Sequence, residues 1–554
     1  MMRSLILVFA ALPAAGAYLH PVTTFDGSVV YIEAPTRFNS TEWQKIWMED
    51  GRVTARGLGR GPGDVGQGAM ADVSADGAAV ATTYYGTRRC DFGGSTCFVA
   101  APCRAGAILE RAAGRRDISG YRTLARLSRD GFSLWIEQEQ VCRGFEPAQP
   151  QYQGLYRAAD LQLLVPRSGF SLASRRSGRH NVTEKNEALV FASNGQLHLL
   201  GSAGSRVIRH IYGATEAVVD SQGRFVVYTE GDPGRVRWID VAAGSDEDLA
   251  PSPVHGSAPM LSDDGELLAF LSPEGRLTTF RRAGRSIETV PLEGEPIEEY
   301  VLAGDGRSAF VTTSDGRLLR VDLARRQVET WLEAFPEIAA ISAPLTSPVL
   351  CPLPCYGTPP GQYYLPPGAR VAFGGRFPDL ERWGVRIGRV TLPLRAGENG
   401  WAWFQFPDAP TNRMQTTALI ENPAHPLRFE WSVSIYSAVT CYGTLHQSFD
   451  RLVTPADPAR VGEVVHVFMT GFEGEETIPY GELNPVDRLI RVPFPPELGG
   501  EGALEQWFFG LAPGLIGVQQ MDIRVLRVIS PDADQRLFGP IYPGGNCQLP
   551  ATAP

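Results

Sequence analysis

The sequence predicts an all-β protein, in which a β-propeller of about seven blades is followed by an Ig-like β-sandwich region of two related halves. Three observations lead to this prediction. A strand–turn–strand pattern recurs through the first 335 residues, and beyond residue 367 the strands become longer and lose their even spacing. The 554 residues also include 60 Gly and 43 Pro, which favours many turns and short strands over long helices.

The repeat is clearest between residues 217 and 323, where one pattern is written three times. Each copy is a turn, an apolar strand, a second turn and another apolar strand. Gly223, Gly265 and Gly306 mark the first turns, so the copies follow one another at steps of 42 and 41 residues. A period in this range with strands rather than helices is typical of a propeller blade.

Earlier copies have the same Asp-Gly turns, at Gly27, Gly77 and Gly131, and a weaker copy has Asn186-Glu187 in that place. Gly accepts the positive φ of a tight turn without steric cost, and Asn or Asp tolerate it. Together with the three clear copies, this makes about seven units, and we expect the propeller to occupy residues 18–335.

The repeated S-x-D-G followed by three apolar residues, a short hairpin and an outer strand resembles the TolB-type propeller repeat, over roughly residues 20–335. The resemblance implies a fold and no particular activity, because propellers serve as binding platforms, enzymes and scaffolds.

The second region begins after a Pro-rich linker, which we expect at residues 336–366. The first sandwich half is expected at 367–454 and the second at 455–554. Two pairs of segments support an internal repeat: residues 368–377 resemble 462–472, and residues 403–407 resemble 518–523.

The second half resembles the Solibacter-type C-terminal domain, over roughly residues 365–528. The resemblance rests on a Thr-Gly turn, a Gly-Leu-Ala-Pro-Gly corner and a strand that carries a Gln, with Phe404-Gln405-Phe406-Pro407 ending the first half. It implies an exported bacterial β-sandwich and no reaction. Residues 408–455 and the cysteines depart from the family pattern. The matching residues of the second half are Thr470, Gly471, Gly510, Leu511, Ala512, Pro513, Gly514 and Gln520.

Residues 1–17 are expected to be a signal peptide that is cut after Ala17. Arg3 precedes a short apolar run, which ends in the small residues Ala15-Gly16-Ala17. The alternative is a membrane anchor, but a spanning helix needs ~20 apolar residues. We therefore expect a secreted or periplasmic protein without a transmembrane segment.

The eight cysteines form two groups of four, and an even number in an exported chain indicates disulfides. The alternative for Cys351 and Cys355 is zinc, but no second closely spaced pair and no nearby His completes such a site. Each group allows three pairings. The disulfide candidates are Cys90, Cys97, Cys103, Cys142, Cys351, Cys355, Cys441 and Cys547.

Catalytic motifs are scarce. The sequence contains no H-E-x-x-H, G-x-S-x-G, phosphate-loop or dinucleotide-binding motif, so we expect no cofactor and no metal. The acidic runs 263–266 and 245–248 do not have the spacing of an EF-hand loop and are expected to be turns. A net charge of -10 without a Lys/Arg block argues against a nucleic-acid partner.

Two kinds of side chain are ambiguous. His198 and His466 lie in predicted strands and are expected to be packed rather than ligating. Trp401 and Trp403 are two residues apart on one strand and therefore share a face, which we expect to fill the sandwich core.

The function that these patterns favour is that of an exported, monomeric, non-catalytic binding protein. Its ligand is unknown, with polysaccharide and protein as the two candidates. The alternative is a hydrolase or lyase that acts on polysaccharide or peptide at the propeller funnel. Acidic or His side chains that converge on the funnel would favour the enzyme.

Overall fold

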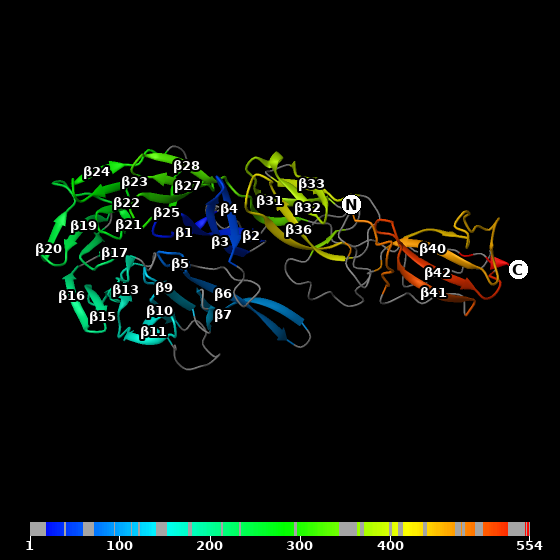
Figure 1. The fold of residues 1–554 in the computed structure, drawn as a ribbon, viewed down its shortest axis with the longest axis horizontal. Helices are drawn as coiled ribbons and strands as arrows, with labels where there is room; N and C mark the ends of the chain where they lie inside the picture. Colours follow the sequence, from blue (N-terminus) through cyan, green and yellow to red (C-terminus); the bar gives the residue numbers. More distant parts are fainter. Residues whose placement is uncertain are drawn as a thin grey trace. The chain divides into compact units, whose positions relative to one another are not determined.

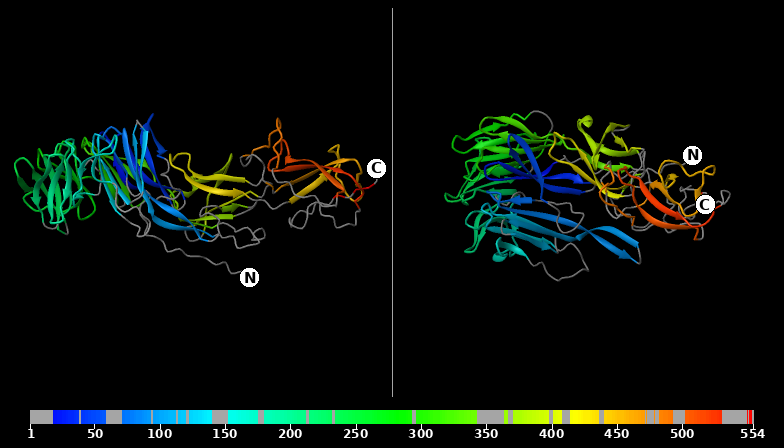
Figure 2. Two further views of the ribbon diagram at one scale, coloured as in Figure 1. Left: turned by 90° about the horizontal axis from the view of Figure 1, so that it is seen from below. Right: turned by 45° about the vertical axis from the view of Figure 1, so that its right-hand side comes forward.

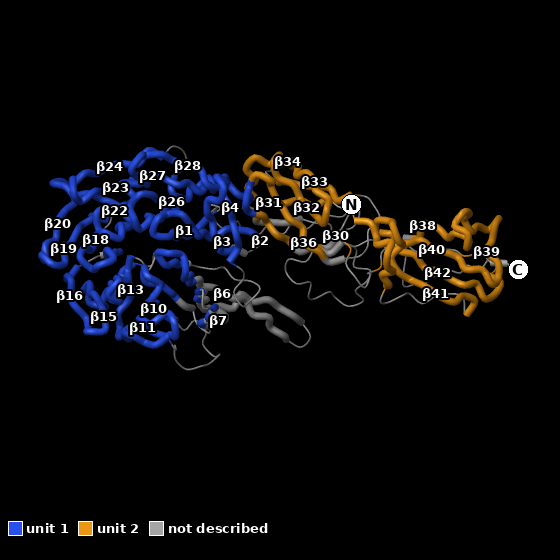
Figure 3. Tube along the Cα trace, viewed as in Figure 1, with its two compact units in different colours: residues 1–337, 425–427 blue, residues 338–424, 428–554 orange. Residues whose placement is uncertain are grey.

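The structure is a computed structural model, and it divides into two compact units (Figure 3). Unit 1 comprises residues 1–337 and 425–427, and unit 2 comprises residues 338–424 and 428–554. The residues that the structure describes are 18–37, 40–58, 71–92, 95–111, 114–119, 122–139, 152–174, 180–211, 214–231, 234–292, 296–342, 363–365, 370–397, 401–407, 414–435, 440–470, 472, 478, 482–492, 502–529, 549 and 551–552.

Unit 1 is a succession of antiparallel meanders, in which each strand pairs with the next along the chain. The first is formed by β1 (Leu19–Thr23), β2 (Val29–Arg37), β3 (Ser40–Glu49) and β4 (Arg52–Gly57). The second and third are four-stranded sheets, β5 (Ala71–Val73), β6 (Ala79–Phe92), β7 (Ser95–Arg111) and β8 (Gly114–Ser119), then β9 (Arg122–Leu127), β10 (Ser133–Glu139), β11 (Gln153–Arg157) and β12 (Gln162–Pro166).

Four further four-stranded sheets follow in the same order of strands. They are β13 (Ser171–Leu172), β14 (Ala188–Phe191), β15 (Gln196–Gly201) and β16 (Gly204–His210); β17 (Ala214–Val219), β18 (Phe225–Glu230), β19 (Arg235–Asp240) and β20 (Ser245–Asp248); β21 (Ser257–Leu261), β22 (Leu267–Leu271), β23 (Leu277–Arg281) and β24 (Ser286–Thr289); β25 (Ile297–Leu302), β26 (Ser308–Thr313), β27 (Leu318–Asp322) and β28 (Gln327–Leu332).

Neighbouring sheets contact one another all the way round, and the first strands of the sheets lie innermost (Figure 1). β1 contacts β5, β5 contacts β9, and β12 contacts β15. β14 contacts β17, β17 contacts β21, β21 contacts β25, and β25 contacts β1 again. Repeated four-stranded meanders arranged in this way are β-propeller repeats, which confirms the all-β architecture predicted for this part of the chain. Figure 2 shows the same sheets from two further sides.

The core of unit 1 lies between adjacent sheets. One cluster joins Val227 and Trp238 of one sheet to Leu268 and Phe280 of the next. Because the sheets are covered on both faces, middle strands can be buried throughout, as β26 is at every position. This explains why the repeats read as continuous apolar runs.

The turns between the first two strands of each sheet have the backbone that the Asp-Gly pairs predict. Gly265 has a φ of 70°, and the equivalent residue of the weak copy, Asn186, has a φ of 58°. Asn is one of the few residues that tolerate this left-handed region, so the turn is kept where the Gly is lost.

The first part of unit 2 is a pair of packed sheets. β29 (Glu337–Ser342), β31 (Arg370–Arg376), β35 (Trp401–Gln405) and β34 (Arg395–Ala396) form one sheet. β33 (Val390–Pro393), β32 (Gly384–Ile387), β36 (Met414–Glu421) and β37 (Phe429–Ile435) form the other, with β30 (Tyr363–Leu365) parallel to β37 and a short 3-10 helix at Leu380–Arg382. Trp431 of the second sheet meets Phe373 and Phe404 of the first edge-on, at 5.3 and 6.0 Å between ring centroids.

The second part of unit 2 is built on the sheet β38 (Thr440–Leu445), β40 (Val464–Thr470), β42 (Gln519–Val525) and β41 (Leu504–Leu511). This part of the chain also contains a short parallel pair, β39 (Ala459–Arg460) and β43 (Ala551–Thr552). β38 comes from the range expected to belong to the first sandwich half, and it pairs with β40. The Ig-like character of the region stays a prediction.

The expected core position of Trp401 and Trp403 is wrong. Along β35 it is Ala402 and Phe404 that are fully buried, whereas both Trp side chains are half-buried on the opposite face. Arg370 stacks on the Trp403 ring at 3.8 Å. A Trp ring covered by a guanidinium is stable at the surface because the cation–π contact and the apolar stem of Arg shield it.

Replacing Gly265 by Ala tests the turn. A Cβ at Gly265 would lie 2.6 Å from Phe225 Cδ2, whereas Gly275 has a similar φ of 74° and nothing within 4 Å. Both Ala variants should lose about 1–2 kcal/mol from the left-handed backbone, and Gly265→Ala should lose about 1–3 kcal/mol more from overpacking. Urea unfolding of the two variants measures the difference. Equal losses would mean that Phe225 moves aside at no cost.

Candidate functional site

The candidate site lies along the axis that the innermost strands surround, and its first component is the Ser-x-Asp-Gly turn. Ser262 Oγ donates to Asp264 Oδ1 at 2.6 Å and accepts from the Leu267 N–H at 2.9 Å. Asp264 Oδ1 also accepts from the Glu266 N–H at 3.0 Å. The same three bonds form at Ser74/Asp76 and Ser128/Asp130. The side chains of the motif therefore replace the backbone partners that a tight turn lacks.

Main-chain hydrogen bonds join most successive turns, through the residue that follows the Ser or its equivalent and, at the last turn, also through Asp305. The bonds run from Phe25 N to Ala75 O (2.8 Å), Ala75 N to Arg129 O (2.6 Å), Glu184 N to Ser221 O (2.8 Å), Ser221 N to Asp263 O (3.1 Å), Asp263 N to Gly304 O (2.8 Å) and Asp305 N to Phe25 O (2.8 Å). Among the described residues, the step from Arg129 to Glu184 has no such main-chain bond, and an ion pair between the two side chains spans it instead.

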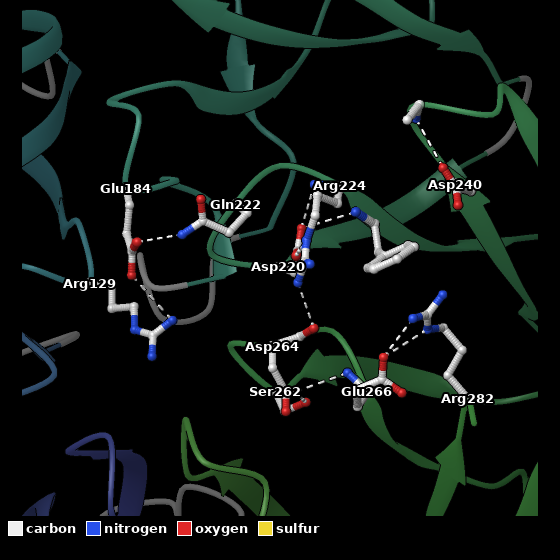
Figure 4. A network of polar contacts seen from close by, with 12 residues as sticks. Arg129, Glu184, Asp220, Gln222, Arg224, Asp240, Ser262, Asp264, Glu266 and Arg282 are labelled. Carbon is white, nitrogen blue, oxygen red and sulfur yellow. Dashed lines mark hydrogen bonds and ion pairs between the residues drawn. The ribbon is translucent and has the colours of Figure 1, made fainter. Parts of the chain in front are cut away.

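Arg129 spans this step and also crosses the axis. Its Nη1 lies 3.5 Å from Glu184 Oε1 (Figure 4), and its Nη2 lies 2.5 Å from Asp263 Oδ2, a carboxylate that is 4% exposed. Its guanidinium also lies 4.8 Å from the centre of the Phe25 ring. Arg129 therefore ties together three turns that lie on different sheets.

A second set of contacts extends from this point (Figure 4). The carboxylate of Asp220, which is fully buried, accepts from the N–H groups of Arg224 and Phe225 and pairs with the Arg224 side chain. Arg224 in turn donates to the Asp264 carbonyl at 2.9 Å. Asp220 thus takes the role that Ser has in the other turns, with a stronger, charged acceptor.

The other end of the innermost strands carries a histidine between two carboxylates. His20 Nδ1 lies 3.1 Å from Glu299 Oε1, and its Nε2 lies 3.9 Å from Glu33 Oε2. The His20 main-chain N–H also donates to Glu299 Oε2 at 2.6 Å. The turn at residues 24–28 follows β1, so His20 lies at the far end of this strand from the turn.

Burial opposes the charged form of His20 and by itself lowers its pKa. The hydrogen bond to Glu299 and the attraction of the Glu299 and Glu33 carboxylates outweigh burial and the nearby Arg126 charge, so the pKa of His20 is raised from the ordinary 6.5. Because both ring nitrogens face a carboxylate, the two glutamates stabilise the protonated, positively charged form of His20. It is poorly suited to act as a general base, which needs a free nitrogen directed at a substrate.

The position of His20 gives it a role in closing the ring. Among the described residues, no sheet combines strands from residues 19–57 with strands from residues 297–332. The first and last sheets are instead joined by His20–Glu299, by Asp305–Phe25 and by Tyr18, whose hydroxyl donates to the Glu333 carbonyl at 2.7 Å.

The predicted disulfide residues are only partly described. Cys90 of β6 stands opposite Cys97 of β7 in the strand register. Cys441 of β38 is disulfide-bonded, and its partner is not among the residues whose side chains the structure describes. The side chains of Cys90, Cys97, Cys103, Cys142, Cys351, Cys355 and Cys547 lie outside the described part, so the pairing stays a prediction.

The remaining predicted positions are packed or in turns. His198 and His466 are 7% and 8% exposed, as expected for packed histidines. Residues 245–248 form a strand rather than a turn, which corrects that expectation, and Asp264 caps its own turn. No group of three or more His, Cys, Asp or Glu that could hold a metal occurs among the described residues.

Sequence reasoning missed Arg129, His20 and Glu299, although a signal for them exists. Arg129 occupies the variable position of its Ser-x-Asp-Gly motif, and aligning the motifs places Phe25, Glu184 and Asp263 in the same column. His20 and Glu299 each lie four residues before the first residue of their turn, Thr24 and Ala303. The alignment of repeats could therefore have identified these residues, but not their partners.

No family model matches the chain, and no curated protein matches it. The chain is similar to solved structures at low identity. The C-terminal WD40 domain of Sif2 is 9% identical, over 71% of this chain and 96% of that chain, with a TM-score of 0.37. The β-propeller domain of Myceliophteria thermophila Cps50 (Swd1) is 12% identical, over 57% and 97%, with a TM-score of 0.36.

A structure named for TolB from Agrobacterium tumefaciens is 12% identical, over 57% of this chain and 80% of that chain, with a TM-score of 0.23. Because each score is below 0.5, the propeller repeats rest on the sheets and their contacts described above. In the described part of the chain, no helix has the length and apolar character that crossing a membrane requires.

Stability should depend on pH through His20. Because its folded pKa is raised, its contribution is fully present below the unfolded value of 6.5 and is lost as pH rises through the folded pKa. The thermal midpoint of His20→Gln relative to the native chain, followed between pH 5 and 9, should show the largest deficit at low pH.

His198 supplies the control of opposite sign. Burial lowers its pKa, so its contribution is present above pH 6.5 and is lost as pH falls. His198→Gln should therefore show its deficit at high pH. Parallel profiles for the two variants would contradict the assignment of His20 as an ion-paired group.

The contact between Arg129 and Asp263 should be strongly coupled. A double-mutant cycle with Arg129→Met and Asp263→Asn should give an interaction energy of about 1–3 kcal/mol in urea unfolding, since removing one partner leaves the other charge buried. The control is Arg307 and Asp305, whose atoms are 4.0 Å apart with Arg307 84% exposed. That pair should give about zero, and equal values for both pairs would rule out the axial role of Arg129.

Proposed function

We propose that this chain is an exported, non-catalytic binding or interaction protein, with a seven-bladed propeller as its platform. The binding face is formed by the Ser-x-Asp-Gly turns. The observation that carries the proposal is that one backbone geometry, repeated around a hydrogen-bonded ring, carries a different side chain in each blade.

Two positions of the turn vary while its backbone stays the same. The residue after the Ser lies near the axis and is aromatic in Phe25, basic in Arg129 and acidic in Glu184. The residue after the Gly lies further out, where Phe132 is 45% exposed and the Arg307 side chain is 84% exposed. Exposed aromatic and Arg side chains of this kind are enriched in protein interfaces.

The main-chain bonds between turns, together with the Arg129–Glu184 ion pair, support recognition because they hold this face in one arrangement. A surface that is already ordered loses little conformational entropy when a partner binds. The turns at Ser74, Ser128 and Ser262 are fixed by their own Ser and Asp side chains and by neighbouring turns, so the variable side chains are displayed from an ordered backbone.

The other parts of the chain support export. The leader at residues 1–17 and the two groups of cysteines suit a secreted or periplasmic compartment. Unit 2, with two sandwich halves of Ig-like and Solibacter type, would act as a spacer or as a cell-surface interaction region. The protein is proposed to work as a monomer.

The alternative is a hydrolase or lyase at the propeller axis, and one observation favours it. His20, Glu33 and Glu299 converge there, as the enzyme hypothesis requires. Each nitrogen of His20 is directed at a carboxylate, however, and the far end of the axis is crossed by Arg129 and Asp263. These contacts are better suited to holding the ring closed than to acting on a substrate.

A capture experiment tests the binding face. The full chain would be immobilised and exposed to the exported proteins of its source, beside Phe132→Ala/Arg307→Ala and a control, Val207→Ala/Val328→Ala. Val207 and Val328 are 52% and 41% exposed but lie on the outer strands β16 and β28. The native chain and the control should retain the same protein, and the turn variant about tenfold less.

Retention that is equal in all three, or absent from the native chain, would refute the proposed face. The enzyme hypothesis is tested by a parallel assay, in which cleavage of polysaccharides and peptides is measured with the native chain and with Glu299→Gln. Cleavage that is lost in Glu299→Gln at an unchanged thermal midpoint would establish the enzyme instead.

A further inference from the structure

The outer face of the sheet β38–β40–β42–β41 is unlike the core face in composition. Along β42 the side chains of Met521 and Ile523 are fully buried, and those of Gln520, Asp522 and Arg524 alternate with them on the other side. Strands β40, β42 and β41 lie side by side in Figure 1. We call this surface the outer face of the second half, formed by Phe449, His466, Glu505, Trp507, Gln520, Asp522 and Arg524.

Phe449 is held over this face as an exposed ring. It is 49% exposed, and its other side stacks on His466 at 3.7 Å between ring centroids and 14° between planes. Its φ of 59° is unusual for a bulky residue. The loop is closed by bonds from Phe449 N to His446 O and from His446 N to Arg451 O, at 2.8 and 3.0 Å. Phe449 therefore combines a left-handed backbone with a ring that is about half exposed.

Trp507 is a second exposed ring, on the neighbouring part of the face. It is 56% exposed, and its Nε1 donates to Glu505 Oε2 at 3.1 Å. Arg524, which pairs with Glu505 in the strand register, lies 5.6 Å from the Trp507 ring centre. The indole is thus oriented by its neighbours while much of its surface stays open.

Between the two rings lies a polar centre. Asp522 Oδ1 contacts His466 Nδ1 at 2.6 Å and accepts from Gln520 Nε2 at 2.7 Å. His466 Nε2 has no partner among the described residues, although the His466 side chain is nine-tenths buried. A buried polar atom without a partner among the described residues is uncommon and is a candidate for contact with another group.

The spacing of the two rings suits an extended ligand. Phe449 lies over β40 and Trp507 belongs to β41, with β42 between them. Neighbouring strands are ~4.8 Å apart, which places the rings roughly 10 Å from each other across a flat sheet. Two rings that are two strand spacings apart can be contacted together by a chain-like ligand that lies across the strands.

We propose that the outer face of the second half binds a linear, uncharged polysaccharide. Sugar rings present an apolar face of C–H groups, which packs on an aromatic ring, and a rim of hydroxyls, which can both donate and accept hydrogen bonds. Phe449 and Trp507 supply the rings. Asp522 and Glu505 accept from hydroxyls, whereas Gln520 and Arg524 donate to them.

Charge argues for this ligand over other macromolecules. The face holds two carboxylates and one guanidinium, so it lacks the basic surface that nucleic acid or an acidic polymer requires. The buried centre of a protein–protein interface is depleted of charged side chains, whereas Asp522 lies at the centre of this face. The hydroxyls of a sugar can hydrogen-bond to this carboxylate in place of water, so the carboxylate keeps hydrogen-bond partners when the sugar binds.

Affinity electrophoresis of the full chain tests this site independently of the propeller face. The probes are gels that contain hydroxyethylcellulose, arabinoxylan, galactomannan or dextran, with polygalacturonate as the charged comparison. At least one of the four uncharged polymers should retard the native chain, and polygalacturonate should not. Phe449→Ala and Trp507→Ala should each weaken the retardation about tenfold, because each removes one stacking surface.

The matched control is Val528→Ala, whose side chain is 59% exposed in the same half of unit 2 but lies beyond the end of β42. It should bind like the native chain. Gln520→Ala, which keeps both rings, should also weaken binding and so confirms that hydrogen bonding contributes. Thermal midpoints of all variants should match the native chain, because the replaced residues are exposed or at the sheet surface.

Three results would overturn the proposal. They are an absence of retardation in all four uncharged gels, unchanged retardation of both ring variants, and retardation by polygalacturonate alone. None of these depends on Phe132 or Arg307, so the outcome is separate from that of the turn-face experiment.

Discussion

The main-chain hydrogen bonds between successive turns are the interaction on which the architecture of unit 1 depends. A single sheet of four short strands has little independent stability, and here each sheet is covered on both faces by its neighbours. The bonds that run from Phe25 to Arg129 and from Glu184 to Gly304 fix the order and spacing of the sheets at the axis, and the Arg129–Glu184 ion pair spans the step between them. Side chains support these bonds. Ser and Asp hold the turns at residues 74–76, 128–130 and 262–264, and Asp220 holds its own turn, so that the next N–H and C=O are directed at the adjacent turns.

The ring is closed in a different way, because among the described residues the first and last sheets share no strand. The structure solves it with side chains: His20 pairs with Glu299, and Tyr18 donates to the Glu333 carbonyl. Arg129 then crosses to Asp263 at the opposite end of the innermost strands. Ionisable groups near the axis are therefore engaged with one another, which directs the search for a ligand toward the faces of the repeats rather than the axis.

Unit 2 follows a different rule because its sheets are covered on one face only. In the second half, alternation along β40 and β42 places Val465, Val467, Met521 and Ile523 in the core and leaves polar and aromatic side chains outside. The first half shows the same arrangement, with Phe404 inside and Trp403 outside under Arg370. One-sided sheets can carry a ligand surface along their whole outer face, which sheets buried on both sides cannot do.

The positions of the repeated turns were determined by the sequence alone, because a left-handed φ requires Gly or Asn at particular residues and this requirement is local. For the same reason, the all-β class and the propeller repeats could be predicted from the Asp-Gly spacing and the apolar runs. The partners of the axial residues could not be predicted. His20 and Glu299 are 279 residues apart, and only the closing of the ring brings them together.

The same limit explains the error at Trp401 and Trp403. A period of two residues determined that the two side chains share a face, but alternation does not say which face is buried. The packing of Phe373 and Phe404 against Trp431 decided that. Local conformation is thus determined by the residues themselves, whereas the choice of buried face and the pairing of distant charges depend on contacts that exist only after the sheets have assembled.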